Sequence, residues 1–356
     1  MKDLHKMCER FLKLHVRFVV IVVLVFCLAG CTVSGKPRPR PGCYAANTMG
    51  VNFRDARSIG RHNFGASLGE STGIVYTCSG GHIDLSHLRI GSDHVYYLYN
   101  FCRKRLAAGR TDWRFNLSYD PTQFHAIIEY PAGFNSMAPA EREKLIDDVS
   151  LELAEYFTWY LTTWHEIITW YGHGTFLVSE FHSAFAWEDS YSNLLGVILG
   201  AKAAAAAAGS GTGAYNAAMT SLLEDELIRL GAVPKSQAKD ASESMRGKWY
   251  SGSVVVQMLL RNFDVGGADG CVSPAIVPNA CKNVTPACLP IPNLQKFKAA
   301  GFKLRLEASP PGHIKSKIKR LIKTGSTGPL LADEHLPLVM KQLASEAREK
   351  GYLVIE

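Results

Sequence analysis

The sequence contains no pair of cysteines spaced as Cys-X-X-Cys, and no His-Glu pair is followed by a second histidine at the fourth position after the first. These absences argue against a zinc ribbon, a thioredoxin-type site and the standard metalloprotease helix. We find no internal repeat and no uninterrupted apolar run of the roughly 20 residues that span a bilayer. The 356 residues are 47% hydrophobic and 20% charged. That is ordinary globular composition, which excludes disorder, collagen and coiled coil.

The N-terminus has the organisation of a signal peptide. Residues 1–17 carry five Lys or Arg against two acids, and an apolar run of 11 residues follows, Phe18–Leu28. A basic start before an apolar core of this length is typical of secretory signals. The run ends in Leu28-Ala29-Gly30-Cys31, which resembles the lipobox of bacterial lipoproteins. The resemblance implies cleavage before Cys31 and attachment of lipid, such as palmitate, to that cysteine.

Three segments are therefore expected: a signal peptide over 1–30, a lipidated Pro-rich tether over 31–45 and a single domain over 46–356. The stretch 35–42 alternates Pro with Lys, Arg or Gly, so it cannot form a helix. By analogy with lipoprotein sorting, Thr32 favours the outer membrane. We expect the domain to be held by its lipid at the periplasmic face of that membrane, with the multi-chain lipid giving stable anchoring.

Cleavage changes the charge and the cysteine count. Removing residues 1–30 takes away five basic and two acidic groups, so the net charge falls from +7 to +4. An even number of cysteines then remains for pairing: Cys43, Cys78, Cys102, Cys271, Cys281 and Cys288. In an oxidising compartment this number favours up to three disulfides. The last three cluster in a Pro-rich loop, which indicates at least one local bridge.

Hydrophobic periodicity predicts an α+β fold, a predominantly helical single domain with a few short antiparallel strands. The expected strands are 73–78, 113–119, 124–130, 174–181, 303–306 and 352–355. The expected helices are 84–108, 135–172, 187–208, 215–230 and 252–262. Gly-rich residues 209–213 are predicted to form a mobile loop.

The first candidate site is the adjacent pair His165 and Glu166 on the long helix. An imidazole beside a carboxylate can supply a metal ligand and a general base. His173 follows eight residues after His165, about 12 Å along a helix, so the two cannot share one zinc ion. A buried pair that only specifies packing is the alternative.

The second candidate follows the turn at Gly81. Asp84 and His87 are three residues apart and share one face of a helix, where the carboxylate can orient the imidazole. Asp93 is a further candidate carboxylate nearby. The competing interpretation is that Asp84 merely caps the helix.

The third candidate is the pair Glu188 and Asp189, which begins an otherwise apolar helix. Acids at a helix N-terminus are also favoured by the helix dipole alone. If this helix packs on the long one, His87, His165 and Glu188 would supply two imidazoles and a carboxylate. That set suits a hydrolytic divalent metal such as zinc.

Four strings together resemble an uncharacterised family of Gram-negative lipoproteins classed as a domain of unknown function. They are 73–77, 81–89, 165–172 and 188–196. The resemblance implies an envelope lipoprotein and carries no known reaction.

We therefore expect a periplasm-facing hydrolase, metal-dependent, that acts on an envelope glycan or lipid. His87 and His165 would bind metal or transfer protons, Glu166 would be the base, and Asp84 and Glu188 would orient or ligate. The alternative is a non-catalytic structural or binding lipoprotein of the envelope. Nucleic acid is not expected as a partner.

Overall fold

The fold is that of a computed structural model, which describes residues 35–66, 68–117, 120–174, 181–267, 269–322 and 328–356. The expected signal peptide, Cys31 and most of the expected strand at 174–181 lie outside these ranges. Within them, no helix combines the length and the apolar character needed to traverse a bilayer.

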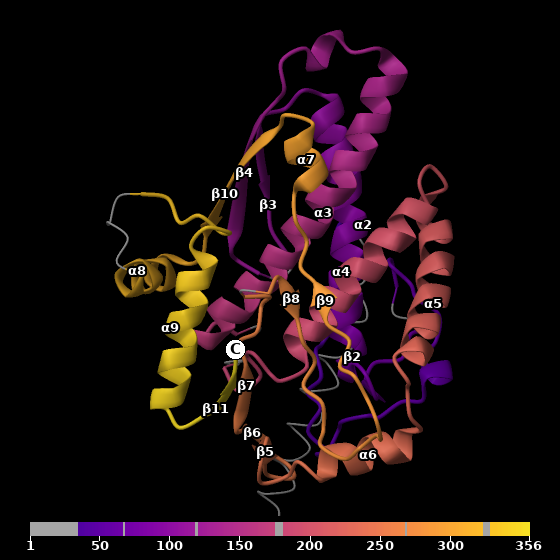
Figure 1. The fold of residues 1–356 in the computed structure, drawn as a ribbon, viewed down its shortest axis with the longest axis vertical. Helices are drawn as coiled ribbons and strands as arrows, with labels where there is room; N and C mark the ends of the chain where they lie inside the picture. The colour runs from indigo at the N-terminus through magenta and orange to yellow at the C-terminus, as the bar shows by residue number, and fades with distance from the viewer. Residues whose placement is uncertain (1–34, 67, 118–119, 175–180, 268, 323–327) are drawn as a thin grey trace, which may run out of the picture.

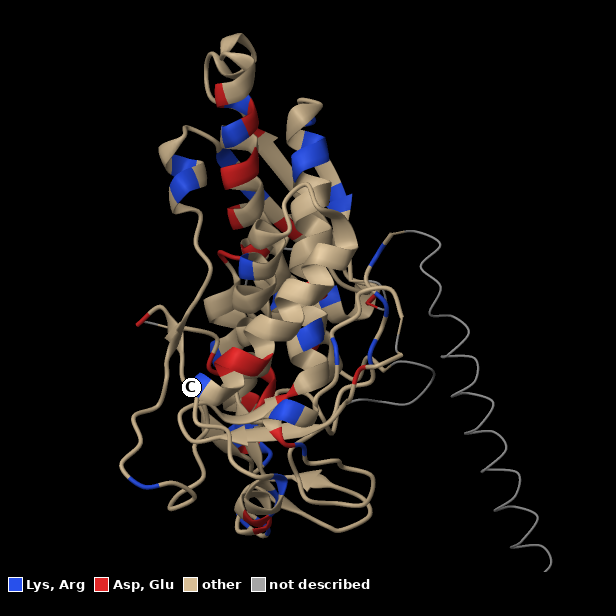
Figure 2. Ribbon diagram, turned by 90° about the vertical axis from the view of Figure 1, so that its right-hand side faces the viewer, with Lys and Arg blue, Asp and Glu red and all other residues tan. Residues whose placement is uncertain are grey.

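Four helices form the body of the molecule: α2 (Leu85–Ala107), α3 (Pro139–Trp170), α4 (Asp189–Ala206) and α5 (Gly211–Arg229). Helix α2 contacts both α3 and α4, and α4 also contacts α5 (Figure 1). Charged residues are interspersed on the N-terminal part of α3, at the top of Figure 2, and few lie along the middle of the bundle. The core of the bundle is mainly apolar, so each charged group buried in it needs a specific reason.

Glycine sets the close approach of α2 and α4. A Cβ added at Gly196 would lie 2.0 Å from the backbone oxygen of Leu88, and one added at Gly200 would lie 2.5 Å from the Cα of Ser92. On the facing helix, a Cβ at Gly91 would lie 2.7 Å from the oxygen of Asn193. Backbones this close leave no room for a methyl group, so the small residues fix the spacing at which α4 presents its N-terminus to α2.

A three-stranded antiparallel sheet lies along one side of α3, in the order β10-β4-β3 (Figure 1). Its strands are β3 (Asp112–Phe115), β4 (Gln123–Glu129) and β10 (Lys303–Ser309). Burial alternates along β4, as expected for a sheet with one solvated face. The inner face packs aromatic rings against α3, with the ring of Phe157 4.7 Å from that of Phe115.

The hairpin of β1 (Ile74–Thr77) and β2 (Gly81–Asp84) leads directly into α2. The remaining elements are η1 (Ala56–Ser58), η2 (Phe134–Ser136), α6 (Lys235–Glu243), β5 (Tyr250–Ser251), β6 (Gln257–Met258), β7 (Leu260–Asn262), β8 (Cys271–Val272), β9 (Leu289–Pro290), α7 (Gln295–Ala299), α8 (Gly312–Leu321), α9 (Leu336–Glu349) and β11 (Leu353–Ile355). The fold is α+β and mainly helical, as the sequence predicts.

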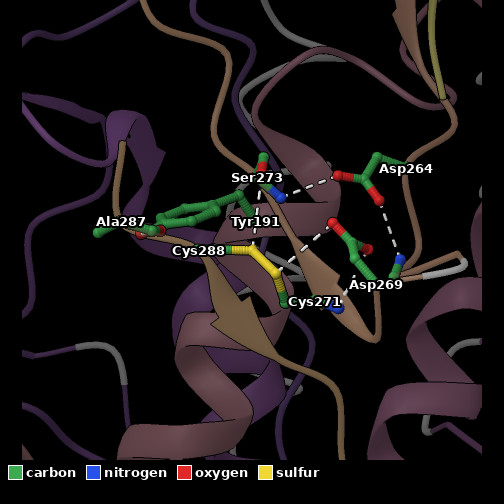
Figure 3. The surroundings of a disulfide bond; sticks show 8 residues. Tyr191, Asp264, Asp269, Cys271, Ser273, Ala287 and Cys288 are labelled. Atoms are coloured by element: carbon green, nitrogen blue, oxygen red, sulfur yellow. Dashed lines mark hydrogen bonds between the residues drawn. A yellow bond between two sulfur atoms is a disulfide. The ribbon is translucent and has the colours of Figure 1, made fainter. Parts of the chain in front are cut away.

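Two disulfides join the described cysteines. Cys78 pairs with Cys281, and Cys271 pairs with Cys288 across the β8–β9 hairpin, while Cys43 and Cys102 are free. The prediction of a local bridge in the Pro-rich loop is confirmed. Figure 3 shows this hairpin lying against α4, where the hydroxyl of Tyr191 donates a hydrogen bond to the carbonyl of Ala287 (2.8 Å).

Several predicted elements are wrong or shifted. The predicted helix at 252–262 is instead the short strands β6 and β7, and the helix α6 was not predicted. Helix α5 begins at Gly211, so most of the expected mobile loop is helical. The strand β11 pairs with β7 in parallel rather than antiparallel.

The expected tether also differs from the structure. We call residues 36–47 the strap, because they lie along the body rather than away from it. Arg38 and Arg40 are buried, at 8% and 6% exposure, and Ala45 and Ala46 are fully buried. The charges of the two arginines and the backbone N–H groups of the strap pair with groups on the body, as described below. A Pro-rich segment that extended away from the body would have no such partners.

We predict that Gly196→Ala destabilises the protein by about 1–3 kcal/mol, because the added methyl overpacks the contact between α4 and the Leu88 backbone. Gly213→Ala is the matched control, since a Cβ there meets nothing within 4 Å, and alanine in a helix is favoured over glycine by about 0.5–1 kcal/mol. Urea unfolding of both variants checks this. Equal midpoints for the two would contradict the described helix packing.

Candidate functional site

Asp84 stands at the junction of β2 and α2 and binds on two sides. One carboxylate oxygen accepts a hydrogen bond from the N–H of Ser86 (2.8 Å), so Asp84 caps α2 as predicted. The other oxygen accepts one from the N–H of Cys43 in the strap (2.9 Å). The hydroxyl of Ser192 on α4 accepts a hydrogen bond from the backbone N–H of Asp84 (2.9 Å). A single buried residue thus joins the hairpin, α2, α4 and the strap.

His87 lies in the first turn of α2, with its ring between two carboxylates. Its Nδ1 is 2.8 Å from Oδ2 of Asp84 and 3.2 Å from Oδ1 of Asp189. Both contacts are ion pairs when the imidazole is protonated. The side chain of His87 keeps 17% exposure, whereas both carboxylates are buried. The expected pairing of Asp84 with His87 is therefore present, and Asp189 joins it.

The charges around His87 favour its protonated form. Burial alone would lower the pKa of the imidazole, but the carboxylates of Asp189 and Asp84, and then that of Glu166, raise it well above its usual value. These charges therefore favour the protonated imidazole of His87 over the neutral one.

Glu188 and Asp189 begin α4 and lie almost completely inside the protein. Glu188 accepts a hydrogen bond from the N–H of Ala45 in the strap (2.6 Å), and its other oxygen has no hydrogen-bond partner. Burial and the neighbouring charge of Asp84 raise the pKa of Glu188 to about 8. Glu188 is thus a neutral acid at pH 7, able to donate a proton.

Glu166 reaches the same region from α3. One of its oxygens accepts a hydrogen bond from the N–H of Phe185 (3.0 Å). Phe185 has a φ of 54°, in the left-handed region that a bulky residue rarely occupies. Glu166 therefore holds a strained turn immediately before Glu188. We call Asp84, His87, Glu166, Glu188 and Asp189 the His87 centre.

His165, the neighbour of Glu166, faces another partner. Its Nδ1 lies 2.9 Å from Oδ2 of Asp120, which follows β3 in the chain. His173 lies beyond the end of α3, where its N–H bonds the carbonyl of Ile168. The structure thus does not join these two histidines to the His87 centre.

The residues do not fit the predicted zinc site. Among the described residues, the ligand atoms of His87, His165 and Glu188 do not all lie within 4.8 Å of one another, as one mononuclear ion requires. The group that does meet this distance is Asp269 with Cys271 and Cys288. Its two sulfurs are bonded to each other (Figure 3), so they are not thiolate ligands.

Asp93 belongs to a separate buried cluster that binds the strap. Its carboxylate pairs with Arg40 (2.6 Å) and with Nε2 of His62 (2.9 Å). Arg40 and Arg38 both pair with Glu70. Although burial opposes it, the positive charge of Arg40 holds the pKa of Asp93 well below its usual value. Asp93 is thus a charge partner of the strap, not a neighbour of His87.

The strap passes directly over His87. A Cβ added at Gly42 would lie 3.1 Å from Cε1 and 3.2 Å from Nε2 of the ring. The next residue, Cys43, has a pKa raised to about 12 by burial and by the charges of Asp84 and Glu188. Its thiol is therefore protonated at neutral pH and is not an activated nucleophile.

Comparison with protein families supports the part of the resemblance that concerns a domain of unknown function. A family described as "Protein of unknown function (DUF4056)" matches residues 45–269, more than half of the chain. The chain belongs to this family. No curated protein and no solved structure matches it. All five residues of the His87 centre lie inside the part that matches DUF4056, whereas Arg38, Arg40, Gly42 and Cys43 of the strap precede it.

Sequence reasoning missed the strap and its partners. The alternation Pro-Arg-Pro-Arg was one available signal, because residues two apart in an extended segment point to the same side. No sequence pattern pointed to the contact between Asp120 and His165, since that contact depends on how Asp120 and α3 pack together in the fold.

We predict that the protein loses stability as the pH rises from about 5 to 8. Folded Glu188 keeps its proton to about pH 8, whereas the unfolded residue loses it near 4.5, so the folded state binds more protons in this window. His87, with its raised pKa, acts in the same direction above about 6.5. One such group contributes at most about 1.4 kcal/mol per pH unit.

Urea unfolding between pH 5 and 8 measures this slope. Glu188→Gln should flatten it, because glutamine does not titrate, while Glu349→Gln at the exposed end of α9 should leave it unchanged. A slope unaffected by Glu188→Gln would show that Glu188 is ionised in the folded protein.

Proposed function

We propose that this DUF4056 protein is a lipid-anchored lipoprotein of the cell envelope, held at the periplasmic face of the outer membrane. The lipobox-like sequence ending in Cys31 supports the anchor. The disulfides Cys78–Cys281 and Cys271–Cys288 support an oxidising compartment, where such bonds persist.

We further propose that the His87 centre is an acid–base site for hydrolysis of an envelope component. The observation that carries this proposal is the placement of His87 between the carboxylates of Asp84 and Asp189, with Glu188 beside them and all three carboxylates buried. Buried groups of this kind are costly unless they are paired, and strongly shifted pKa values gather at functional sites.

The roles follow from the protonation states. Neutral Glu188 has an unpaired oxygen and would donate a proton to the leaving group. Protonated His87, held by Asp84 and Asp189, would stabilise negative charge that develops in the transition state. Glu166 is the candidate general base that takes the proton of water. The candidate substrates are the glycan and lipid of the envelope.

The geometry also favours a second candidate function, a purely structural one. Asp84 and Glu188 accept hydrogen bonds from the backbone of Cys43 and Ala45, so they fasten the strap to the body. On this account, the His87 centre joins the anchored N-terminal segment to the domain and performs no reaction.

We predict that the mature protein releases products from peptidoglycan sacculi or from phospholipid vesicles. His87→Asn and Glu188→Gln should each reduce the rate at least about 100-fold, as loss of an acid–base group does. Mass spectrometry of the soluble products measures the rate.

His125→Asn is the matched control. His125 also has 17% side-chain exposure and also lies between two carboxylates, Asp112 and Glu307. It belongs to β4 in the three-stranded sheet and not to the His87 centre. Its loss should leave the rate unchanged. No release from either substrate by the wild-type protein, together with strong destabilisation of both centre variants, would favour the structural function instead.

A further inference from the structure

Exposed apolar side chains gather where the strap ends. Met49, Val254 and Val255 are 74%, 63% and 80% exposed, so together they present apolar surface to the solvent. They come from two segments far apart in sequence, which a hydrogen bond from the N–H of Met49 to the carbonyl of Ser253 (3.0 Å) holds together. We call Met49, Val254 and Val255 the apolar tip.

The apolar tip is built on a turn rather than on a flat face. Val254 and Val255 lie in the connection between β5 and β6, the paired strands at the bottom of Figure 1. Gly252, with a φ of 85°, starts this turn, and a Cβ there would lie 2.0 Å from the carbonyl oxygen of Val255. The close turn pushes the two valines outward. A small projecting tip suits insertion between lipid headgroups better than the wide, flat contact of a protein interface.

Basic residues stand beside the tip. Arg246 donates hydrogen bonds to the carbonyls of Gly252 and Asn47, which fixes both segments of the tip, and it also pairs with Glu243. Lys248 is exposed two residues further along. Apolar side chains next to Lys and Arg are the combination that binds at the surface of an anionic bilayer.

The proposed lipid anchor places a bilayer within reach. Between Cys31 and Lys36, where the strap begins, the chain can extend at most about 18 Å, at about 3.6 Å per residue. The strap then runs along the body and reaches the apolar tip at Met49. A body held on so short a connection stays near the membrane, and an exposed apolar tip is then better covered by lipid than by water.

We propose that the apolar tip is a second membrane contact, which inserts into the phospholipid surface and fixes the orientation of the body on it. This inference rests on the proposed envelope function, in that the anchor supplies the membrane. The partner of the apolar tip is the bilayer itself. The lipid at Cys31 limits the distance between the body and the membrane, and the tip fixes the orientation of the body on it.

The test uses the mature chain, residues 31–356, with Cys31→Ser so that no lipid is attached. Vesicles of phosphatidylethanolamine and phosphatidylglycerol, at about three to one, supply an anionic surface. Sedimentation with the vesicles gives the partition coefficient. We expect the chain to bind, and Val254→Asp with Val255→Asp to lower the coefficient at least about tenfold.

Leu338→Asp is the matched control, because Leu338 is also exposed, at 50%, but lies on α9 and not in the β5–β6 turn that carries the two valines. It should bind vesicles as the unsubstituted chain does. Equal binding by the tip variant, or no binding by the unsubstituted chain, would overturn the proposal. A change from dimer to monomer in the tip variant, with vesicle binding unaltered, would overturn it by identifying a second copy of the chain as the occupant.

The outcome separates this inference from the proposed function. Vesicle binding through the tip is measured without the lipid and without any substrate. A protein that binds through its tip but hydrolyses nothing would contradict the acid–base proposal alone. A hydrolase whose tip variant binds vesicles normally would contradict the tip alone.

Discussion

The carboxylate of Asp84 is the point on which the rest of the structure depends. It ends β2, caps α2, lies against His87 and accepts a hydrogen bond from the strap. These contacts require that α4 approach α2 closely enough for Asp189 to reach the same imidazole. Glycines at the contact of the two helices allow that approach. The small residues at this contact therefore also determine whether Asp189 lies close enough to pair with His87. A buried carboxylate pair without the imidazole between its members would repel, and His87 offsets that repulsion.

The same arrangement explains why the strap lies on the body. An extended Pro-rich segment makes no backbone hydrogen bonds of its own, so its N–H groups and side chains are free to bind elsewhere. Buried acids on the domain meet them: Asp84 and Glu188 take backbone N–H groups, while Asp93 and Glu70 take the two arginines. The chain that leads from the proposed anchor is thereby fastened along the domain as far as the apolar tip. Anchor, centre and tip are joined by one continuous segment.

Local parts of this picture could be predicted from the sequence. The cap at Asp84 and its meeting with His87 follow from spacing within one helix, and the hairpin of β3 and β4 follows from alternation around Asp120-Pro121. Contacts between distant elements could not be predicted. Asp189 reaches His87 only through the helix packing, and His165 turns to Asp120 because neighbouring helical residues point about 100° apart. The helix predicted at 252–262 fails because its apolar residues form a short run without helical period, which strands also show.

The central claim is that His87 is a cation held by Asp84 and Asp189 in the folded protein. Titration of its ring carbon and nitrogen resonances by NMR measures this most directly, with Asp84→Asn as the companion variant. The account predicts that His87 keeps its proton well above pH 6.5 in the wild type, and loses it at lower pH when the Asp84 charge is removed. A His87 pKa at or below 6.5 in the wild-type protein would contradict it.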